Sequence, residues 1–388
     1  MRLLHTSDWH LGRSFHRVGL LAAQAAYLDH LVEVVRAERV DAVLVAGDVY
    51  DRALPAPETV ELLDDTLVRL TDAGAQVVLA SGNHDSAIRL GFAARLLARG
   101  GVHIRTDLQT IGLPVMVGDV AVYPLPYLEP SVAADRLGAA ERTHAAVLTA
   151  AMDRVRQDRT QRPGQSVVMA HAFVSGGATS DSERDISVGG VGAVHPAVFE
   201  GMDYVALGHL HGAQQIGERA RYSGSPLALS FSESGHAKGA WLVDLGTPDL
   251  HVSQVAAPVL RPLASLRGEL EDLLRDPRHR AAETAYCQVT LTDGIRPLGA
   301  MERLRRRFPH TLVLAFDPAP TAGRALASYA SRTRQRDDLD LCCDFLAHVR
   351  GGAAASAPER GLLRSALEGA RITHQAHEDE GVAARGAA

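Results

Sequence analysis

Short apolar runs, each followed by a turn rich in Asp, Asn, Gly or His, recur along the first 245 residues of the chain. The runs "LLHT", "AVLVA", "QVVLAS", "SVVMA" and "YVAL" have the length of buried strands. Helical patterns over residues 24–37 and 57–73 separate the first three of them. Strands that alternate with helices are typical of βαβ units, so we expect an α/β domain around a largely parallel sheet.

The polar turns after these strands hold side chains of the kinds that bind metal ions. In chain order they contain D-x-H, G-D, G-N-H-D, a single His and G-H-x-H. The candidate ligands are Asp8, His10, Asp48, Asn83, His171, His209 and His211. Each turn taken alone is more simply explained by a helix cap, a tight turn or a buried histidine. Ligand sites in such sheets form beyond the carboxyl ends of the strands, so the five turns together predict one shared site.

Two carboxylates, one amide oxygen and four imidazoles are enough donors for two metal ions. Mixed oxygen and imidazole donors favour Mn, Fe or Zn over Mg or Ca. We expect Asp48 to bridge the two ions, and a metal pair of this kind activates water for phosphoryl displacement. His84 shares a tight turn with Asn83, so we expect its imidazole to face the substrate and assist the leaving oxygen.

Length, composition and charge narrow the class of protein. A chain of 388 residues suggests two or three domains. It is 46% hydrophobic and 22% charged, and it lacks the roughly 18 unbroken apolar residues of a membrane span. The formal charge of −6 argues against nucleic-acid binding by bulk electrostatics alone, although bound cations would invert the field locally. We see no secretion signal before the first strand and expect a cytoplasmic protein.

The pattern changes after residue 258, where a small α+β module is expected. A helix is predicted over residues 263–276, a strand over 285–293, a second helix over 298–308 and a second strand over 311–318.

The remainder of the chain is predicted to be a linker, two helices and a tail. Residues 321–338 are rich in Ala, Ser, Arg and Asp, as linkers are. Amphipathic helical patterns follow over residues 339–351 and 358–370. The final residues, 373–388, have the composition of a disordered tail.

Four phrases are more specific than the candidate ligands themselves. They are "LLHTSDWHLGRSFH", "AGDVYDRALPAPE", "GHLHGAQQI" and "YSGSPLALSFSE". With them the sequence resembles the calcineurin-like metallophosphoesterases and, within these, the SbcD-type nuclease subunits, which are bacterial relatives of the eukaryotic double-strand-break repair nuclease. The resemblance is close over the first 245 residues and looser beyond them.

The resemblance implies a fold for each part of the chain. It implies a four-layer αββα sandwich, a small α+β cap domain that shapes DNA access and a C-terminal helical hairpin that docks an ATPase. The boundaries we expect are 1–257 for the nuclease domain, 258–320 for the cap, 321–338 for the linker, 339–372 for the docking hairpin and 373–388 for the tail.

The resemblance also implies how the candidate ligands are shared. One ion would take Asp8, His10, Asp48 and His211. The other would take Asp48, Asn83, His171 and His209. His84 would be catalytic, and Asp85 would support the ligands. Relatives often carry a His at the position of Asp51, so we assign that residue no role. The ions expected are two Mn²⁺ per chain, or other divalent transition metals.

The function implied is a Mn-dependent DNA nuclease in repair, recombination and replication. It would act as an exonuclease on duplex ends and as an endonuclease on single-stranded or hairpin DNA, near the nucleoid. We expect a heterotetramer in which an SbcC-type ATPase binds Leu341, Phe345 and Leu346, and in which the chain pairs with itself through a helix at residues 87–98. Two alternatives are a small-substrate metallophosphoesterase, disfavoured by the C-terminal modules, and a catalytically inactive DNA-bridging scaffold, disfavoured by the full ligand set.

Overall fold

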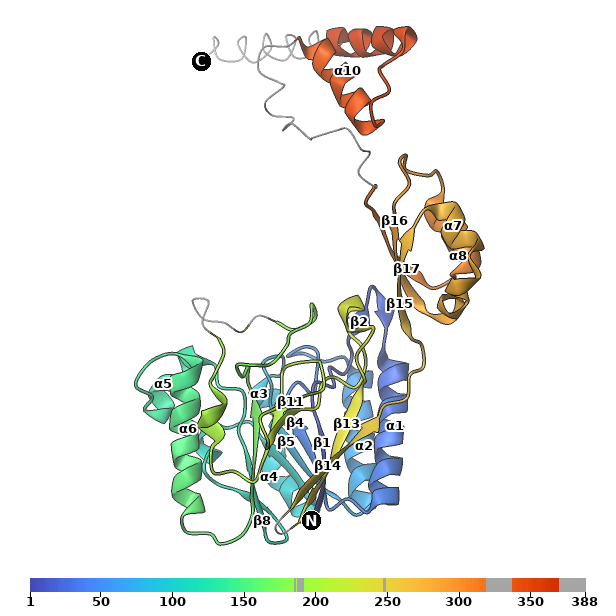
Figure 1. The fold of residues 1–388 in the computed structure, drawn as a ribbon. Helices are drawn as coiled ribbons and strands as arrows, with labels where there is room; N and C mark the ends of the chain where they lie inside the picture. The colour runs from blue at the N-terminus through green and yellow to red at the C-terminus, as the bar shows by residue number, and fades with distance from the viewer. Residues whose placement is uncertain (185, 187–191, 247–248, 319–336, 370–388) are drawn as a thin grey trace, which may run out of the picture. The chain divides into compact units, whose positions relative to one another are not determined.

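The computed structural model describes residues 1–184, 186, 192–246, 249–318 and 337–369 (Figure 1). The chain divides into two compact units, Met1–Ala264 and Ser265–Ala388, which are described separately below. Most of the predicted linker and all of the predicted tail lie outside the described residues.

The first sheet of the N-terminal unit has six strands in the order β14-β13-β1-β4-β5-β6. Its four parallel strands are β1 (Arg2–Thr6), β4 (Ala42–Ala46), β5 (Gln76–Ala80) and β6 (Val102–Arg105). The two antiparallel additions are β13 (Gly239–Leu245) and β14 (Leu250–Ala256). Every residue of β4 is buried, as in a strand that is covered on both faces.

The second sheet also has six strands, in the order β11-β12-β10-β9-β8-β7. Its parallel strands are β8 (Val120–Pro124), β9 (Ser166–His171), β10 (Tyr204–Gly208) and β12 (Ala220–Tyr222). The antiparallel edges are β7 (Val115–Val117) and β11 (Gln214–Ile216).

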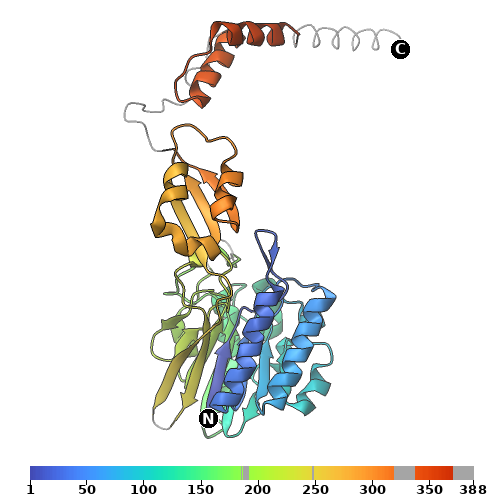
Figure 2. The same ribbon diagram turned by 90° about the vertical axis from the view of Figure 1, so that its right-hand side faces the viewer.

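The two sheets pack face to face, and helices cover both outer faces (Figures 1 and 2). The core between the sheets includes Leu44 of β4 and Met169 of β9. The first sheet is covered by α1 (Leu21–Glu38) and α2 (Pro57–Asp72), and the second by α5 (Pro130–Leu137) and α6 (His144–Arg159). This arrangement confirms the predicted four-layer αββα sandwich.

Short elements complete this unit. They are β2 (Ser14–Phe15), β3 (Val18–Gly19), α3 (Ala87–Leu90), α4 (Ala94–Leu97), η1 (Ala98–Gly100), η2 (Leu108–Thr110), η3 (Pro196–Phe199) and η4 (Phe231–Glu233).

The helix predicted over residues 87–98 is wrong, because the chain forms two single-turn helices there, α3 and α4. Ala93 lies between them with a φ of 58°, in the left-handed region, which no continuing α-helix allows. Gly91 turns the chain against β6, where a Cβ would lie only 2.4 Å from the hydroxyl of Thr106. The expected apolar face therefore divides: Leu90 is buried, while 81% of Phe92 is exposed.

The second unit contains a three-stranded sheet in the order β15-β16-β17. Its elements are β15 (Leu263–Gly268), α7 (Leu270–Arg275), η5 (Pro277–Thr284), β16 (Tyr286–Leu291), α8 (Ala300–Arg307) and β17 (Thr311–Phe316). The two predicted strands and the second predicted helix correspond to β16, β17 and α8.

The single helix predicted over residues 263–276 is wrong, because its first half forms β15. Leucines at 263, 266 and 270 have helical spacing, but pairing with β16 decides the conformation, as tertiary context often does for short apolar segments. The helix α7 begins only after Glu269, and it buries Leu270 and Leu273.

The described C-terminal part contains two helical segments, α10 (Asp338–Val349) and residues 357–369. Ion pairs join them: Arg350 lies 2.8 Å from Glu359, and Arg360 lies 2.6 Å from Asp340. This agrees with the predicted helical hairpin. None of the helices in the described ranges is long and apolar enough to cross a bilayer.

Candidate metal centre

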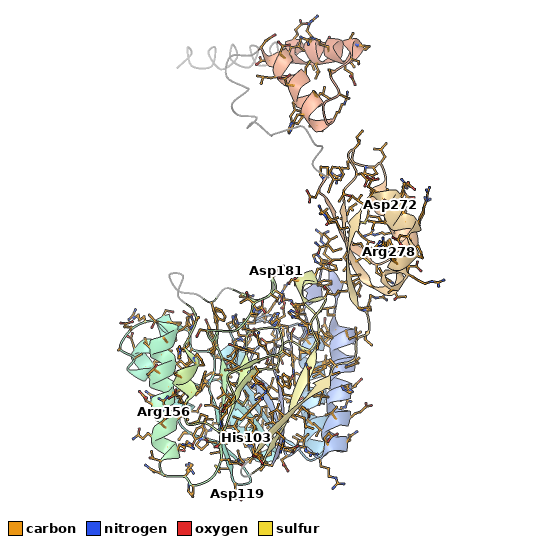
Figure 3. The ribbon with its side chains drawn as sticks, viewed as in Figure 1. His103, Asp119, Arg156, Asp181, Asp272 and Arg278 are labelled. Carbon is orange, nitrogen blue, oxygen red and sulfur yellow. The ribbon has the colours of Figure 1, made fainter. Side chains whose placement is uncertain are left out.

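The loops that follow β1, β4, β5, β9 and β10 meet at one end of the sandwich, where their strands end. Figure 3 labels Asp181 at this end and Asp119, in the turn between β7 and β8, at the opposite end. The structure brings all seven candidate ligands together there, although they span more than 200 residues of sequence.

A first cluster consists of Asp8, His10 and His211, whose ligand atoms lie within 4.8 Å of one another. The Nε2 atoms of His10 and His211 are 3.1 Å apart. Both carboxylate oxygens of Asp8 lie 3.1 Å from the backbone N–H of His209, and the hydroxyl of Ser7 also donates to this carboxylate. All three side chains of the cluster are buried.

A second cluster consists of Asp8, Asp48 and His171. Asp48 Oδ2 is 3.5 Å from His171 Nε2 and 3.6 Å from His10 Nε2. The side chain of Asn83 joins through its Oδ1, 2.9 Å from His171 Nε2, and the ring of His209 lies 5.4 Å from that of His171. The two clusters share Asp8, and Asp48 of the second lies close to His10 of the first, so both carboxylates lie between the clusters. The bridging role expected for Asp48 stays a prediction.

The groups around His171 favour a positive charge at its imidazole, either a proton or a metal ion on Nε2. Its Nδ1 lies 2.9 Å from the carbonyl oxygen of Ala46, which only accepts hydrogen bonds, so Nδ1 carries a proton. Its Nε2 faces the oxygens of Asn83 and Asp48. Burial would lower the pKa of His171, but Asp48 and Asp8 raise it to about 9. A proton and a metal ion compete for the same Nε2 lone pair, so metal binding would release that proton.

The pKa values of the other ionisable groups bear on metal binding as well. Burial lowers the pKa of His10 to about 4 and that of His209 to about 3, so both imidazoles are neutral near pH 7. Burial alone would raise the pKa of Asp48, but His171 and His10 hold it well below its usual range. Burial raises the pKa of Asp8. A neutral imidazole beside an ionised carboxylate is the combination that divalent transition metals prefer.

Four of the candidate ligands have left-handed backbone conformations. The φ angles are 52° at Asp8, 45° at His10, 49° at Asp48 and 103° at His209. Residues other than glycine rarely adopt positive φ, and such strain is concentrated at functional sites.

Glycines allow the loops to approach the ligands closely. A Cβ at Gly82 would lie 2.1 Å from Asp48 Oδ1, and one at Gly208 would lie 1.9 Å from the carbonyl oxygen of Ala46. These two positions therefore require glycine for packing, independently of any metal.

His84 forms a third cluster with His10 and Asp48, whose ligand atoms lie within 4.8 Å of one another, and its ring lies 4.6 Å from that of His10. Its backbone N–H donates to Asp48 at 2.8 Å, and its Nδ1 lies 2.8 Å from the carbonyl oxygen of Asp51. Its Nε2 is 3.8 Å from Asp48 Oδ2. Burial lowers the pKa of this imidazole.

Asp85 joins the loops after β4 and β5. Its carboxylate accepts backbone N–H groups from Val49 at 3.1 Å, Tyr50 at 2.9 Å and Gly82 at 2.9 Å. Burial and the charge of Asp48 raise the pKa of Asp85 to about 7, although the three N–H donors favour its ionised form. These contacts fix the two loops against each other, and the supporting role expected for Asp85 stays a prediction.

Sequence reasoning missed several residues that contact the candidate ligands. Asp51 Oδ1 lies 3.5 Å from His10 Nδ1, and it also pairs with Arg13 at 3.2 Å. Glu183 accepts the backbone N–H of His211 at 2.8 Å, and Ser182 contacts the imidazole of the same residue. The sequence contained one signal of buried polar contacts behind His211. Lys238, which donates to the carbonyl oxygen of His211, is the only lysine of the chain.

A cavity of about 630 Å³ adjoins the site. Asn83 and Asp85 line it on one side, and Ile88, Tyr127 and Arg136 contribute to the rest of its wall. This volume lies within the range of roughly 300–1,000 Å³ that is typical of ligand pockets. A substrate larger than a phosphate group therefore has room beside the candidate ligands.

The fold, with grouped Asp, His and Asn side chains at one end of its sheets, is that of a metallophosphoesterase. The chain belongs to the calcineurin-like phosphoesterase family, whose profile matches residues 1–213. Residues 259–350 match a second profile, SbcD_C, described as the type 5 capsule protein repressor C-terminal domain.

Three solved structures illustrate the similarity. A dimetal phosphatase from Danio rerio is 13% identical with a TM-score of 0.42, and the match covers 66% of this chain and 96% of that one. A protein from Thermus thermophilus is 13% identical with a TM-score of 0.39, covering 65% and 98%. The calcineurin-like phosphoesterase YfkN from Bacillus subtilis is 11% identical with a TM-score of 0.34, covering 66% and 89%.

Removing the carboxylate that we expect to bridge the ions should empty both metal positions. We expect Asp48→Ala, loaded with Mn²⁺ and then desalted, to retain neither ion in elemental analysis, because Asp48 lies between the clusters. His84→Gln is the matched control: it should keep both ions while turnover of a chromogenic phosphodiester falls by about 10²–10⁴-fold, as when a general acid is lost. Two ions in Asp48→Ala, or metal loss in His84→Gln, would contradict these roles.

Proposed function

We propose that this chain is a Mn-dependent DNA nuclease, an exonuclease on duplex ends and an endonuclease on single-stranded or hairpin DNA. The observation that carries the proposal is the presence, in one chain, of a phosphoesterase domain and a second domain that matches SbcD_C over residues 259–350. Repair, recombination and replication of DNA near the nucleoid are the processes that such an activity would serve.

The candidate ligands would be divided between two ions. Asp8, His10, Asp48 and His211 would hold one. Asp48, Asn83, His171 and His209 would hold the other. When bound, the pair supplies an activated water and stabilises the charge that develops on the phosphoryl oxygens.

His84 would act on the leaving group. Because its Nδ1–H donates to the carbonyl oxygen of Asp51, its Nε2 is the atom available to the substrate. A phosphodiester anion beside Nε2 favours the protonated imidazole, since an opposite charge stabilises the charged form. The imidazolium would then donate its Nε2 proton to the leaving oxygen.

The arginines near His84 favour the binding of a polyanionic substrate. Arg13 pairs with Asp51 at 3.2 Å, and Arg52 lies 3.8 Å from the same carboxylate with 78% of its side chain exposed. Arg184 is exposed and close enough for its charge to lower the pKa of His84. Guanidinium groups suit phosphate contacts, and a nucleic acid offers several phosphates on either side of the one that is cut.

Two surfaces support protein partners. In α10, Leu341, Phe345 and Leu346 lie on one helix, and 57% of Phe345 is exposed. We propose that this helix docks an SbcC-type ATPase through buried aromatic and aliphatic anchors.

The exposed residues Ile88 and Phe92 of the 87–98 segment are proposed to pair with those of a second copy of the chain.

Cleavage assays with the full chain test the nuclease proposal. With Mn²⁺, the protein should cut labelled single-stranded and hairpin DNA, and EDTA should abolish the cutting. Arg184→Ala should raise KM for DNA several-fold, because a nucleic acid carries further phosphates beyond the one that is cut, and should raise KM for a chromogenic phosphodiester much less. Hydrolysis of the small diester without DNA cleavage would favour a small-substrate phosphoesterase. A metal-loaded protein that cuts neither would favour a scaffold.

Phe345→Asp tests the docking proposal. The variant should lose co-purification with the ATPase, because a charge replaces an apolar anchor, while cutting of single-stranded DNA by the isolated chain continues. Leu113→Asp is the matched control, since 57% of Leu113 is also exposed, and it should co-purify normally. Unfolding of Phe345→Asp in circular dichroism would show that this side chain belongs to the chain's own core.

Phe92→Asp tests the homodimer. Light scattering should give the wild-type chain twice its mass of 41.4 kDa at micromolar concentration and the variant the single mass. The reason is that 81% of Phe92 is exposed in the isolated chain, and a charge there would oppose burial in an interface. A wild-type monomer would overturn the proposal.

A further inference from the structure

A buried polar network lies against His211 and includes the chain's only lysine, Lys238. The ammonium group donates to the carbonyl oxygen of His211 at 2.8 Å, to the hydroxyl of Ser225 at 2.9 Å and to the carboxylate of Glu233. An ammonium has three N–H donors, and each has one acceptor here. The side chains of Lys238 and Glu233 are almost completely buried.

The geometry explains why this position is a lysine in a chain that otherwise uses arginine as its strong base. A guanidinium is planar and carries five donors in a fixed fork. With three acceptors here for its five donors, it would leave donors unsatisfied and buried, which costs free energy. A compact ammonium satisfies all three acceptors of this network.

The carboxylate of Glu233 connects Lys238 to Ser182. This carboxylate accepts from Lys238, from the backbone N–H of Leu229 at 3.2 Å and from the hydroxyls of Ser180 and Ser182. A carboxylate paired with an ammonium only accepts hydrogen bonds, so the single proton of Ser182 is directed toward Glu233.

Ser182 in turn determines the tautomer of His211. Its oxygen contacts Nδ1 of the imidazole. Because the hydroxyl proton is directed to Glu233, this oxygen accepts, and the proton of the imidazole must be on Nδ1. The lone pair of Nε2 then faces His10 Nε2, 3.1 Å away, where the first cluster would hold its ion. Partners of this kind behind a metal-binding histidine fix its orientation and raise its basicity.

We propose that Lys238, Glu233 and Ser182 form a positioning relay, which holds His211 as the Nδ1–H tautomer and so sets the affinity of one of the two metal positions. The relay touches neither metal nor substrate. It rests on the proposed function in one respect, that His211 is a ligand. A merely structural network would stabilise the fold and affect both metal positions alike.

Mn²⁺ titration of Ser182→Ala, followed by electron paramagnetic resonance, tests the relay. The wild-type protein should bind two ions and show a spin-coupled spectrum. Ser182→Ala should bind one ion normally and the other about 10–100-fold more weakly, as when a partner behind a metal-binding histidine is lost. At limiting Mn²⁺ its spectrum should become that of an isolated ion. Ser182→Thr retains the hydroxyl and should restore the coupled spectrum.

Ser230→Ala is the matched control, because it removes a hydroxyl from a neighbouring loop whose hydrogen bonds, to the hydroxyl and the backbone N–H of Ser232, do not involve Ser182, Glu233 or His211. It should bind both ions as the wild type does, and the melting temperatures of the metal-free Ser230→Ala and Ser182→Ala proteins should agree. Equal weakening of both ions, or unchanged binding in Ser182→Ala, would overturn the relay. A wild-type protein that binds two ions without cutting DNA would contradict the nuclease and not the relay.

Discussion

The carboxylate of Asp48 is the group around which both sheets are arranged. It lies among three imidazoles at distances of 3.5–3.8 Å, and it also accepts the backbone N–H of His84. A buried carboxylate is costly unless positive charge and hydrogen bonds compensate for lost hydration. His171 at the end of β9 supplies the positive charge and the loop after β5 supplies the hydrogen bond, so burial of Asp48 links the two sheets at their carboxyl ends.

Backbone geometry makes this arrangement possible. Asp8, His10 and Asp48 all adopt left-handed conformations, which cost free energy for residues with a Cβ. Their backbones are held by hydrogen bonds between the loops: Asp8 N–H donates to Gly47 and His10 N–H to Asp48, both at 3.0 Å. The strain of each turn is thus offset by its neighbour, and the ligands are oriented before any ion binds.

The strands and the convergence of the candidate ligands were predictable because both depend on local signals. An apolar run followed by a polar turn identifies the end of a buried strand, and parallel strands bring such ends together. The break at Ala93 depends on packing against β6, and the strand at residues 263–268 depends on pairing with β16. Neither was predictable from local signals. The contact between Ser182 and Glu233 was missed for a similar reason, since 51 residues separate these two side chains.

The distribution of arginine partners bears on where a polyanion would bind. In α8, Arg303 pairs with Glu271, Arg306 with Glu302 and Arg307 with Glu283. These guanidinium groups are largely neutralised within their own module, so the concentration of arginine in α8 does not create a strongly positive surface. Near the metal centre Arg13 and Arg52 likewise pair with Asp51. Bound cations would compensate Asp8 and Asp48 there, and the exposed Arg184, whose charge reaches His84, would add to the positive field of these ions. A chain with a net charge of −6 can therefore present a locally positive site when ions are bound, and its attraction for a phosphate-bearing substrate would depend on its metal content.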